Sequence, residues 1–361
     1  MIPLVVDLET EWRGGQNQAL LLLKGLYERG HAAELVATHG SSLSHRAKKH
    51  GIYVHSVSRR MRRLSAAATI RSILTDGRID LVHANEAHAV TAAWLAVRNR
   101  ALPFVVSRRV GFPLSRRWLA QARYRRADCI LANSQWVAGQ AAASGASHEK
   151  LRVVYEGVDI PPLPTPSEKQ AARQRWSFAD GDVVIGCAGA LQQDKGHEWV
   201  IRALALLQPG FPNCKLLLAG HGEYRPELEA LADELQVRKN VIFAGFLKDV
   251  SVFFQAVDLF IFPSLFEGLG TSLLSAMSYR IPSITFFGCA LGEIVHNEEN
   301  GLQVEPKNSS RIAEAAARLL RDPDFAQRIA EAGRARVIEK FSSDLMVENT
   351  LNVYEELLNQ A

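Results

Sequence analysis

The chain of 361 residues has few cysteines, no long apolar run and no low-complexity segment. Its four cysteines form no C-x-x-C pair and have no histidine nearby at ligand spacing, so neither a disulfide framework nor a zinc site is indicated. No apolar run approaches the ~18 residues that a membrane-spanning helix needs, and the N-terminus has no signal-peptide pattern. We therefore expect a cytoplasmic protein with reduced thiols.

Both halves of the chain alternate short apolar strands with amphipathic helices, which is the pattern of parallel α/β domains. The expected strands are 2–8, 32–37, 79–83, 103–107, 129–132, 151–154, 183–189, 214–219, 240–243, 258–262, 281–285 and 301–304. Between the halves, residues 158–168 (VDIPPLPTPSE) carry four prolines, which predict an extended interdomain linker. The sequence thus predicts two Rossmann-like parallel-sheet domains facing each other across a cleft, residues 1–160 and 161–340.

Charge is distributed unevenly along the chain. Residues 1–160 hold 23 Lys and Arg against 12 Asp and Glu, a net charge of +11, although the whole chain carries only +4. Arg59, Arg60, Arg62 and Arg63 form one of the clusters. This asymmetry predicts an anionic partner, and a plain solvated basic face is the alternative. No nucleic-acid motif accompanies the charge, so we expect no nucleic acid as partner and favour an anionic membrane surface or glycolipid.

Residues 258–282 form the most informative stretch (DLFIFPSLFEGLGTSLLSAMSYRIP). A buried strand is followed by a turn with Gly268 and Gly270 and by a helix starting near Gly270. Glu267 lies at the carboxyl end of the strand, where ligands bind in open α/β sheets, and the helix N-terminus suits a phosphate or a sugar hydroxyl. The alternative is that Glu267 merely caps its own helix.

Other residues follow predicted strands in the same way. Gly14 and Gly15 precede the first helix, and Trp12 beside them could stack on a sugar ring or fill a wall. His83 ends the strand 79–83, and Asn85 and His88 follow it; for His83 a structural hydrogen-bonding role is favoured. Arg108 and Arg109 end the strand 103–107, where bidentate contacts could bind an anionic acceptor or a pyrophosphate.

The P-S-x-x-E-G-x-G pattern that ends at Gly270 closely resembles the donor-binding signature of the family-4 retaining glycosyltransferases of the GT-B fold. The resemblance implies that Glu267 contacts the transferred sugar. The residue eight positions later, usually a Glu that contacts the nucleotide ribose, is Ser275 here. The resemblance also implies a C-terminal helix, residues 341–361, that packs back on the first domain.

Further stretches extend the resemblance over nearly the whole chain. GALQQDKG (189–196) resembles a G-R-L-x-x-x-K-G motif whose Lys and Arg clamp the donor pyrophosphate; Lys195 matches the Lys, and Ala190 replaces the Arg. GFLKDV, with Phe246 and Leu247, resembles the loop that reads the base. Cys289 and Ala290 stand where the family often has two glycines, and Asn85 stands where it often has a histidine, with His88 one helix step away.

The resemblance and the residues together define the predicted sites. The catalytic candidates are Glu267, Lys195, Asn85 and His88, and the acceptor candidates are Trp12, Arg108 and Arg109. The donor candidates are Gly14, Gly15, Lys195, Phe246, Leu247, Glu267, Gly268, Leu269, Gly270, Thr271, Ser272 and Ser275. No D-x-D pair stands in a plausible loop, and no His, Cys and carboxylate cluster is evident from the sequence, so no metal ligand and no cofactor is expected.

The resulting hypothesis is a retaining, hexosyltransferase-type enzyme that moves a sugar from a UDP- or GDP-sugar to a glycan or lipid-linked acceptor of the lipopolysaccharide or polysaccharide type, peripheral at the inner face of the cell membrane. Three alternatives stay open. A lapsed GT-B protein would bind nucleotide or glycan without turnover, as the departures at Ala190, Ser275 and Cys289–Ala290 could imply. A sugar-nucleotide epimerase would need no acceptor, and a phosphorylase would need a cofactor lysine signature that the sequence lacks.

Overall fold

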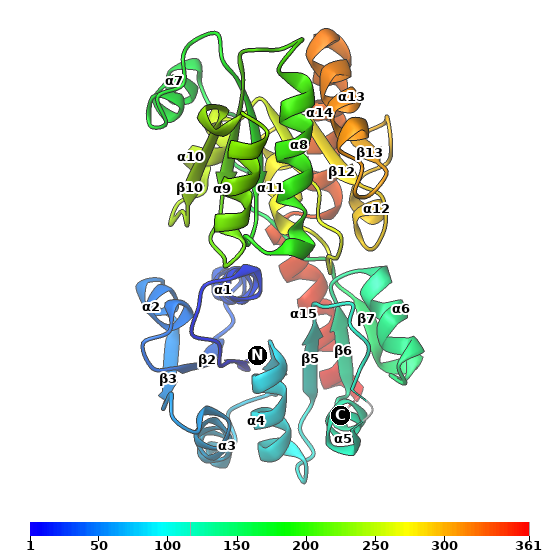
Figure 1. Ribbon diagram of the computed structural model, residues 1–361. Helices are drawn as coiled ribbons and strands as arrows, with labels where there is room; N and C mark the ends of the chain where they lie inside the picture. Colours follow the sequence, from blue (N-terminus) through cyan, green and yellow to red (C-terminus); the bar gives the residue numbers. More distant parts are fainter. Residues whose placement is uncertain (116, 361) are drawn as a thin grey trace. The chain divides into compact units, whose positions relative to one another are not determined.

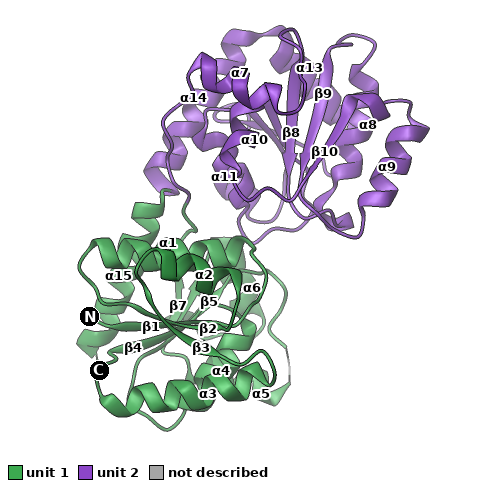
Figure 2. Ribbon diagram, turned by 90° about the vertical axis from the view of Figure 1, so that its left-hand side faces the viewer, with its two compact units in different colours: residues 1–157, 342–361 green, residues 158–341 purple. Residues whose placement is uncertain are grey.

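The computed structural model describes residues 1–115 and 117–360, which form two compact units (Figures 1 and 2). The first unit comprises residues 1–157 and the segment from Ser342 onward, and the second comprises Val158–Phe341. Each unit is a parallel β-sheet flanked by helices on both faces, so the expected class, a GT-B fold of two Rossmann-like domains, is confirmed. The sequence had placed the boundaries after residues 160 and 340.

The sheet of the first unit has the strand order β3-β2-β1-β4-β5-β6-β7, with every neighbouring pair parallel. Its strands are β1 (Pro3–Asp7), β2 (Glu34–Thr38), β3 (Tyr53–Val57), β4 (Leu81–Ala84), β5 (Phe104–Arg108), β6 (Cys129–Ala132) and β7 (Leu151–Val153). The strand order reverses between β1 and β4, which places the loops after these two strands at the switch point where open sheets bind ligands. The edge strand β3 was not predicted.

Alternating side chains of β1 separate the two apolar layers of this unit. Leu4 and Val6 join the core beneath α3 and α4, whereas Val5 faces the core beneath α1 and α15. The helices are α1 (Gly14–Glu28), α2 (Ser42–Lys49), α3 (Arg62–Ile73), α4 (Ala87–Val97), α5 (Trp118–Arg126), α6 (Gln135–Ala143) and α15 (Ser343–Gln360).

The C-terminal helix α15 completes the first unit, where it packs against α1. Its Tyr354 is fully buried, and the tyrosine hydroxyl lies 2.5 Å from His83 Nδ1. The other ring nitrogen of His83 lies 2.7 Å from Ser107 Oγ on β5. Burial, reinforced by Arg109, lowers the pKa of His83 to about 3, so this imidazole is neutral near pH 7 and links α15 to β5.

The sheet of the second unit has the order β10-β9-β8-β11-β12-β13, again parallel throughout. Its strands are β8 (Val183–Ala188), β9 (Cys214–Ala219), β10 (Val241–Gly245), β11 (Leu259–Phe262), β12 (Ser283–Phe286) and β13 (Leu302–Val304). Its helices are α7 (Pro166–Gln174), α8 (His197–Leu207), α9 (Arg225–Glu234), α10 (Ser251–Ala256), α11 (Thr271–Ser278), α12 (Leu291–Ile294), α13 (Ser309–Arg321) and α14 (Pro323–Lys340). Here the order reverses between β8 and β11, the strands that carry the two predicted donor motifs.

The proline-rich segment is shorter than predicted. Helix α7 begins at Pro166, where Thr165 and Glu168 form a capping box, and proline at the first helical position costs no backbone hydrogen bond. The prolines before Thr165 lie outside helices and strands, as their restricted backbone requires. No helix in the described part of the chain is long and apolar enough to cross a bilayer.

Candidate functional site

Two loops at the switch point of the second unit bring Lys195 and Glu267 together. Lys195 follows β8 in a short 3-10 turn, Gln193–Lys195, and Glu267 lies in the loop after β11. The Lys195 Nζ lies 2.8 Å from Glu267 Oε1 and 3.3 Å from the carbonyl oxygen of Phe266. Both side chains are largely covered, with 21% and 18% of their surfaces exposed. The pair therefore presents a cation and a carboxylate side by side.

The geometry of this pair is fixed by backbone contacts between the two loops. The amide of Leu265 donates to the carbonyl oxygen of Asp194 over 2.9 Å. Gly196 has a φ of +68°, and a Cβ at this position would lie 2.2 Å from the Pro263 carbonyl oxygen. Any other residue at position 196 would therefore push the loops apart, which explains the glycine directly after Lys195.

The start of α11 provides a second anion-binding feature beside Glu267. Its N-cap, Gly270, has a φ of +115°, and no side chain among the described residues caps the helix. Glu267 therefore does not cap its own helix but pairs with Lys195. The first-turn amides of Thr271 and Ser272, at the positive end of the helix dipole, suit a phosphate or a sugar hydroxyl.

Other predicted donor residues differ in what they can offer to a ligand. Leu269 is 1% exposed and so offers a ligand almost no surface, whereas Gly268 is half-buried. Ser275 donates its hydroxyl to the carbonyl oxygen of Thr271 over 3.0 Å, so it is occupied within its own helix. Ala190 is exposed and Ala290 is buried, and because alanine has only a methyl side chain, neither side chain supplies a polar group to this site.

The loop after β10 presents an aromatic surface. Phe246 is 48% exposed and lies edge-to-face with His221, the ring centroids being 5.6 Å apart. Leu247 beside it is half-buried. An exposed aromatic ring at the carboxyl end of a strand can stack on a planar base, and the contribution of this loop to base binding stays a prediction.

Sequence reasoning missed His197, the first residue of α8. The imidazole is 1% exposed, and neither ring nitrogen has a hydrogen-bond partner among the described residues. Burial, followed by the charge of Lys195, lowers the pKa of His197 to about 4. A neutral, unpartnered imidazole therefore lies directly beside the lysine loop; its position immediately after Lys195-Gly196 was the available signal.

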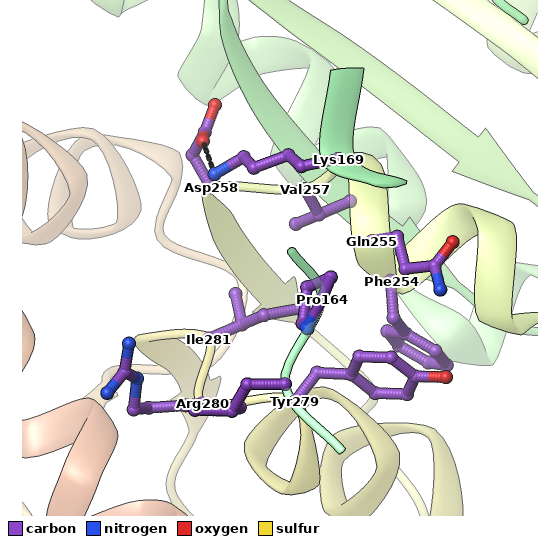
Figure 3. Close-up of a pocket in the computed structure, with 10 residues that line it drawn as sticks. Pro164, Lys169, Phe254, Gln255, Val257, Asp258, Tyr279, Arg280 and Ile281 are labelled. Carbon is purple, nitrogen blue, oxygen red and sulfur yellow. Dashed lines mark hydrogen bonds and ion pairs between the residues drawn. The ribbon is translucent and has the colours of Figure 1, made fainter. Parts of the chain in front are cut away.

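A separate cavity lies at the opposite end of the same strands. It measures about 230 Å³ and is lined by residues that include Lys169, Phe254, Asp258, Tyr279 and Arg280 (Figure 3). Asp258 directly precedes β11, whereas Glu267 follows it, so this cavity is not part of the site around Lys195. An ion pair between Lys169 and Asp258, with a distance of 2.7 Å, crosses its edge.

In the first unit, the switch point holds a buried polar network. Asp7 is fully buried, and its Oδ2 accepts hydrogen bonds from the Asn85 amide over 2.6 Å and from the Gln16 amide over 3.0 Å. Asn85 also donates to the carbonyl oxygen of Gly15 over 3.1 Å, which ties the loop after β4 to the start of α1. Asn85 is thus engaged in structure, and Gly14 and Gly15 are the first residues of α1 itself.

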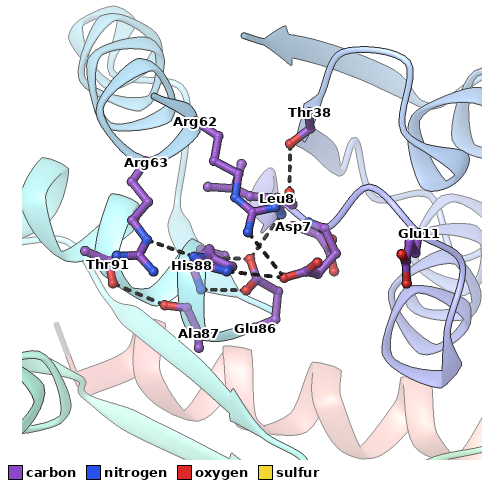
Figure 4. Close-up of polar contacts among 12 residues, drawn as sticks. Asp7, Leu8, Glu11, Thr38, Arg62, Arg63, Glu86, Ala87, His88 and Thr91 are labelled. Carbon is purple, nitrogen blue, oxygen red and sulfur yellow. Dashed lines mark hydrogen bonds and ion pairs between the residues drawn. The ribbon is translucent and has the colours of Figure 1, made fainter. Parts of the chain in front are cut away.

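Glu9, Glu86 and His88 form a half-buried group beside this network. Figure 4 shows Glu86 and His88. Glu86 caps α4 by accepting hydrogen bonds from the amides of His88 and Ala89, and burial followed by the charge of Asp7 raises its pKa to about 7. Arg63 Nε donates to His88 Nδ1 over 2.8 Å, which directs the other ring nitrogen of His88 toward Glu9 at 3.5 Å.

The sequence-based expectation of no histidine and carboxylate cluster was therefore wrong. One ligand atom from each of Glu9, Glu86 and His88 lies within 4.8 Å of the others. The sequence could not reveal it, because Glu9 lies more than seventy residues before the other two and reaches them only through the pairing of β1 with β4. Arg62, 3.8 Å from Glu9, and Arg63 already neutralise the group, so the cluster is an ion-pair network as described.

The two predicted acceptor arginines are also occupied. Arg109 pairs with Glu156 at 2.9 Å and donates to the carbonyl oxygen of Asn85 over 2.7 Å, both within the first unit. Arg108 donates to the carbonyl oxygen of Phe112 and to the Tyr124 hydroxyl. The partners of Arg109 come from distant parts of the chain, so the sequence alone could not show that its guanidinium group serves the fold.

Comparison with known proteins places both units. The model of Glycosyltransferase Family 4 matches residues 12–160, and that of Glycosyl transferases group 1 matches residues 168–336. An uncharacterized glycosyltransferase of Methanocaldococcus jannaschii is 32% identical over 57% of this chain and 54% of its own. The lipopolysaccharide core biosynthesis glycosyltransferase LpsE of Rhizobium meliloti is 28% identical over 73% of this chain and 75% of its own.

A further relative is the GDP-mannose-dependent monoacylated alpha-(1-6)-phosphatidylinositol monomannoside mannosyltransferase of Corynebacterium glutamicum, 30% identical over 63% of this chain and 62% of its own. The chain spans about half the length of some of the curated relatives that it matches. Among solved structures, Anabaena HepE in complex with UDP and glucose has a TM-score of 0.87 at 22% identity, covering 98% of this chain and 99% of HepE. At that identity the likeness shows the fold.

Proposed function

The chain belongs to the group 1 glycosyltransferases, and from that membership we propose that it transfers a sugar from a nucleotide-sugar donor to a glycan or lipid-linked acceptor. The observation that carries the proposal is the Lys195–Glu267 pair beside the uncapped start of α11. A cation, a carboxylate and a helix N-terminus meet at the carboxyl ends of β8 and β11, which is where an open sheet binds its ligand.

Each group has a distinct part in the proposed reaction. Lys195 and the first-turn amides of α11 bind the donor diphosphate and stabilise the charge that develops on it as the bond to the sugar breaks. Glu267 accepts hydrogen bonds from hydroxyl groups of the transferred sugar and holds it in place. Because Lys195 and Glu267 are paired without a ligand, donor binding exchanges this ion pair for a lysine–phosphate contact and carboxylate–sugar contacts.

The relatives support the choice of donor and acceptor. Structures of HepE contain UDP, glucose and UDP-glucose, and the Corynebacterium relative is named for GDP-mannose. LpsE is named for lipopolysaccharide core biosynthesis. We therefore propose a UDP- or GDP-hexose as donor, with retention at the anomeric carbon, and a lipopolysaccharide- or polysaccharide-type acceptor. Since Lys195 and the helix dipole supply positive charge at the diphosphate, the proposed reaction needs no metal.

A donor screen tests this proposal. The protein is incubated with a panel of UDP- and GDP-sugars, and release of nucleoside diphosphate is measured with and without candidate glycan acceptors. We expect release with one donor and its loss in Lys195→Ala, while Lys239→Ala, at an exposed lysine of the same unit, stays at the wild-type rate. Equal turnover in Lys195→Ala and wild type would refute the assignment of the site.

A lapsed enzyme is the second candidate, and one observation favours it. Ser275 stands in place of a ribose-binding carboxylate, and its hydroxyl donates to the Thr271 carbonyl oxygen. The ribose of the donor therefore lacks one contact. Such a protein would bind nucleoside diphosphate in calorimetry and release none from any sugar donor. The same screen therefore separates the two candidates.

We also propose that the protein works at the inner, anionic face of the cell membrane. Arg59, Arg60 and Arg63 are exposed around Met61 and Leu64, which are themselves 67% and 55% exposed. Each arginine near an anionic bilayer contributes about 1 kcal/mol to binding. Because Arg62 and Arg63 also hold the network at Glu9 and His88, only Arg59 and Arg60 can be changed without disturbing it.

The test is sedimentation with vesicles of anionic or of neutral lipid. The variant Arg59→Gln/Arg60→Gln should pellet less with anionic vesicles than the wild type does, and the difference should fade as salt is raised. The control Lys239→Gln/Lys340→Gln removes the same charge from exposed positions of the second unit. Equal pelleting of both variants would leave this arginine cluster as a solvated face.

A further inference from the structure

An open pocket of about 480 Å³ lies between α1 and α2 of the first unit, on the side of the β2 carboxyl end. We call it the α2 pocket. Leu20 of α1, Gly40 of the turn before α2 and Ser42, the first residue of α2, form part of its lining. The rest is contributed by four basic side chains, His45, Arg46, Lys49 and His50. No carboxylate lines it, and within residues 1–115 and 117–360 none of these four side chains is ion-paired.

On α2, Lys49 neighbours Arg46 at i,i+3 and His45 at i,i+4, and His50 is the C-cap residue of the same helix. The guanidinium of Arg46 lies over the Trp12 ring, 4.1 Å from its centroid, so stacking orients its planar fork. His45 donates from Nδ1 to the carbonyl oxygen of Ser41 over 2.9 Å, which fixes the imidazole at the rim. Ser41 in turn caps the helix by accepting from the Ser44 amide. The pocket is thus partly preorganised.

Arg46 and Lys49 line this pocket with no carboxylate beside them, which attracts an anion, and the volume lies in the range of small-molecule sites, about 300–1,000 Å³. We propose that the α2 pocket binds a saccharide that carries a phosphate or a carboxylate, with Arg46 and Lys49 contacting the anionic group. The inference rests on the proposed function, in which such a saccharide is part of the acceptor. It replaces Arg108 and Arg109, which are occupied by internal contacts, as the acceptor's anion-binding group.

Two neighbouring lysines make the proposal testable. Lys48 and Lys49 are consecutive, exposed residues of α2, and only Lys49 lines the pocket. Lys48→Gln and Lys49→Gln therefore remove the same charge from the same helix, but only Lys49→Gln removes a charge from the pocket lining. Because both side chains are exposed, neither variant threatens folding, whereas Arg46→Gln also removes the stacking on Trp12.

Binding is measured by calorimetry on the full chain with glucose 6-phosphate, glucuronate and neutral glucose, and separately with nucleoside diphosphate. We expect the two anionic sugars to bind the wild type and glucose not to bind. Lys49→Gln should weaken glucose 6-phosphate binding about threefold, Arg46→Gln/Lys49→Gln about tenfold, and Lys48→Gln less than about twofold. All variants should bind nucleoside diphosphate as the wild type does.

Three outcomes would overturn the inference. They are equal weakening of glucose 6-phosphate binding by Lys48→Gln and Lys49→Gln, no binding of either anionic sugar by the wild type, and, in the vesicle sedimentation described above, binding to anionic vesicles by a protein that binds neither anionic sugar. Failure here remains separate from failure of the proposed function. The calorimetric signal of an anionic sugar requires no turnover, and the donor screen does not involve the α2 pocket.

Discussion

Replacing Glu267 by glutamine should strengthen nucleoside diphosphate binding while it removes turnover. In the structure without ligand, the Glu267 carboxylate holds the Lys195 ammonium at 2.8 Å, and a diphosphate has to compete for that cation. Glutamine keeps the size but removes the charge and replaces one acceptor oxygen with an NH2 donor. The opposite substitution, Lys195→Ala, removes the cation and should weaken the same ligand.

The expected sizes follow from the burial of the pair. With 21% and 18% of the two side chains exposed, the pair is partly screened, and an energy of at most about 1 kcal/mol corresponds to about fivefold tighter binding in Glu267→Gln. Lys195→Ala loses a charge-assisted contact with the diphosphate, about 1.5–3 kcal/mol, or roughly 10- to 150-fold weaker binding. The two variants therefore move affinity in opposite directions.

The assay is calorimetric titration with UDP and GDP, together with release of nucleoside diphosphate from the matching sugar donor. Glu267→Gln should lose most turnover, because its amide offers the sugar hydroxyls one uncharged acceptor oxygen where the carboxylate offers two charged ones. Lys239→Ala controls for a lost charge elsewhere in the unit. If Glu267→Gln weakened diphosphate binding as strongly as Lys195→Ala does, the assignment of the diphosphate to Lys195 and of the sugar to Glu267 would be wrong.

Three further results are expected. Gly270→Ala should lower the free energy of unfolding by about 2–4 kcal/mol in denaturant titrations, because its φ is +115° and its Cβ would lie 3.0 Å from a leucine methyl group. The control Gly139→Ala meets no atom within 4 Å and should be neutral or stabilising. Burial lowers the pKa of His83 to about 3 and of His197 to about 4, so both bind protons more readily when unfolded, and the free energy of unfolding should fall as pH drops from about 6.5 toward 4. In the first unit the raised pKa of Glu86 opposes this trend. A free energy of unfolding that stays constant over this pH range would contradict the prediction. Turnover should survive EDTA, and activity that requires added manganese or magnesium would contradict the metal-independent proposal.

The donor loops could be predicted from the sequence because each is a local strand–loop–helix segment. The glycines at positions 196 and 270 identify the tight turns, and Lys195 and Glu267 lie within a few residues of them. The edge strand β3 was missed because only one of its five residues is buried, so it lacks the continuous apolar run of the inner strands.

The role of the first unit's polar residues could not be predicted in this way. Asn85 and Arg109 have the composition of a ligand site, yet each is held by a buried carboxylate, Asp7 or Glu156, that lies tens of residues away in the sequence. The same applies to the grouping of Glu9 with His88. Pairwise contacts between distant segments depend on strand order, which single-residue patterns do not specify.

The return of α15 to the first unit has a consequence for synthesis. This unit is not made of one continuous stretch, since its last helix follows the entire second unit in the chain. While the ribosome completes residues 158–341, His83 lacks the tyrosine hydroxyl that it contacts in the finished protein, and the face of α1 that α15 covers is open to water. A fragment that ends at Gly157 would have the same defect permanently, whereas joining residues 342–360 to it through a short linker should restore a cooperative fold.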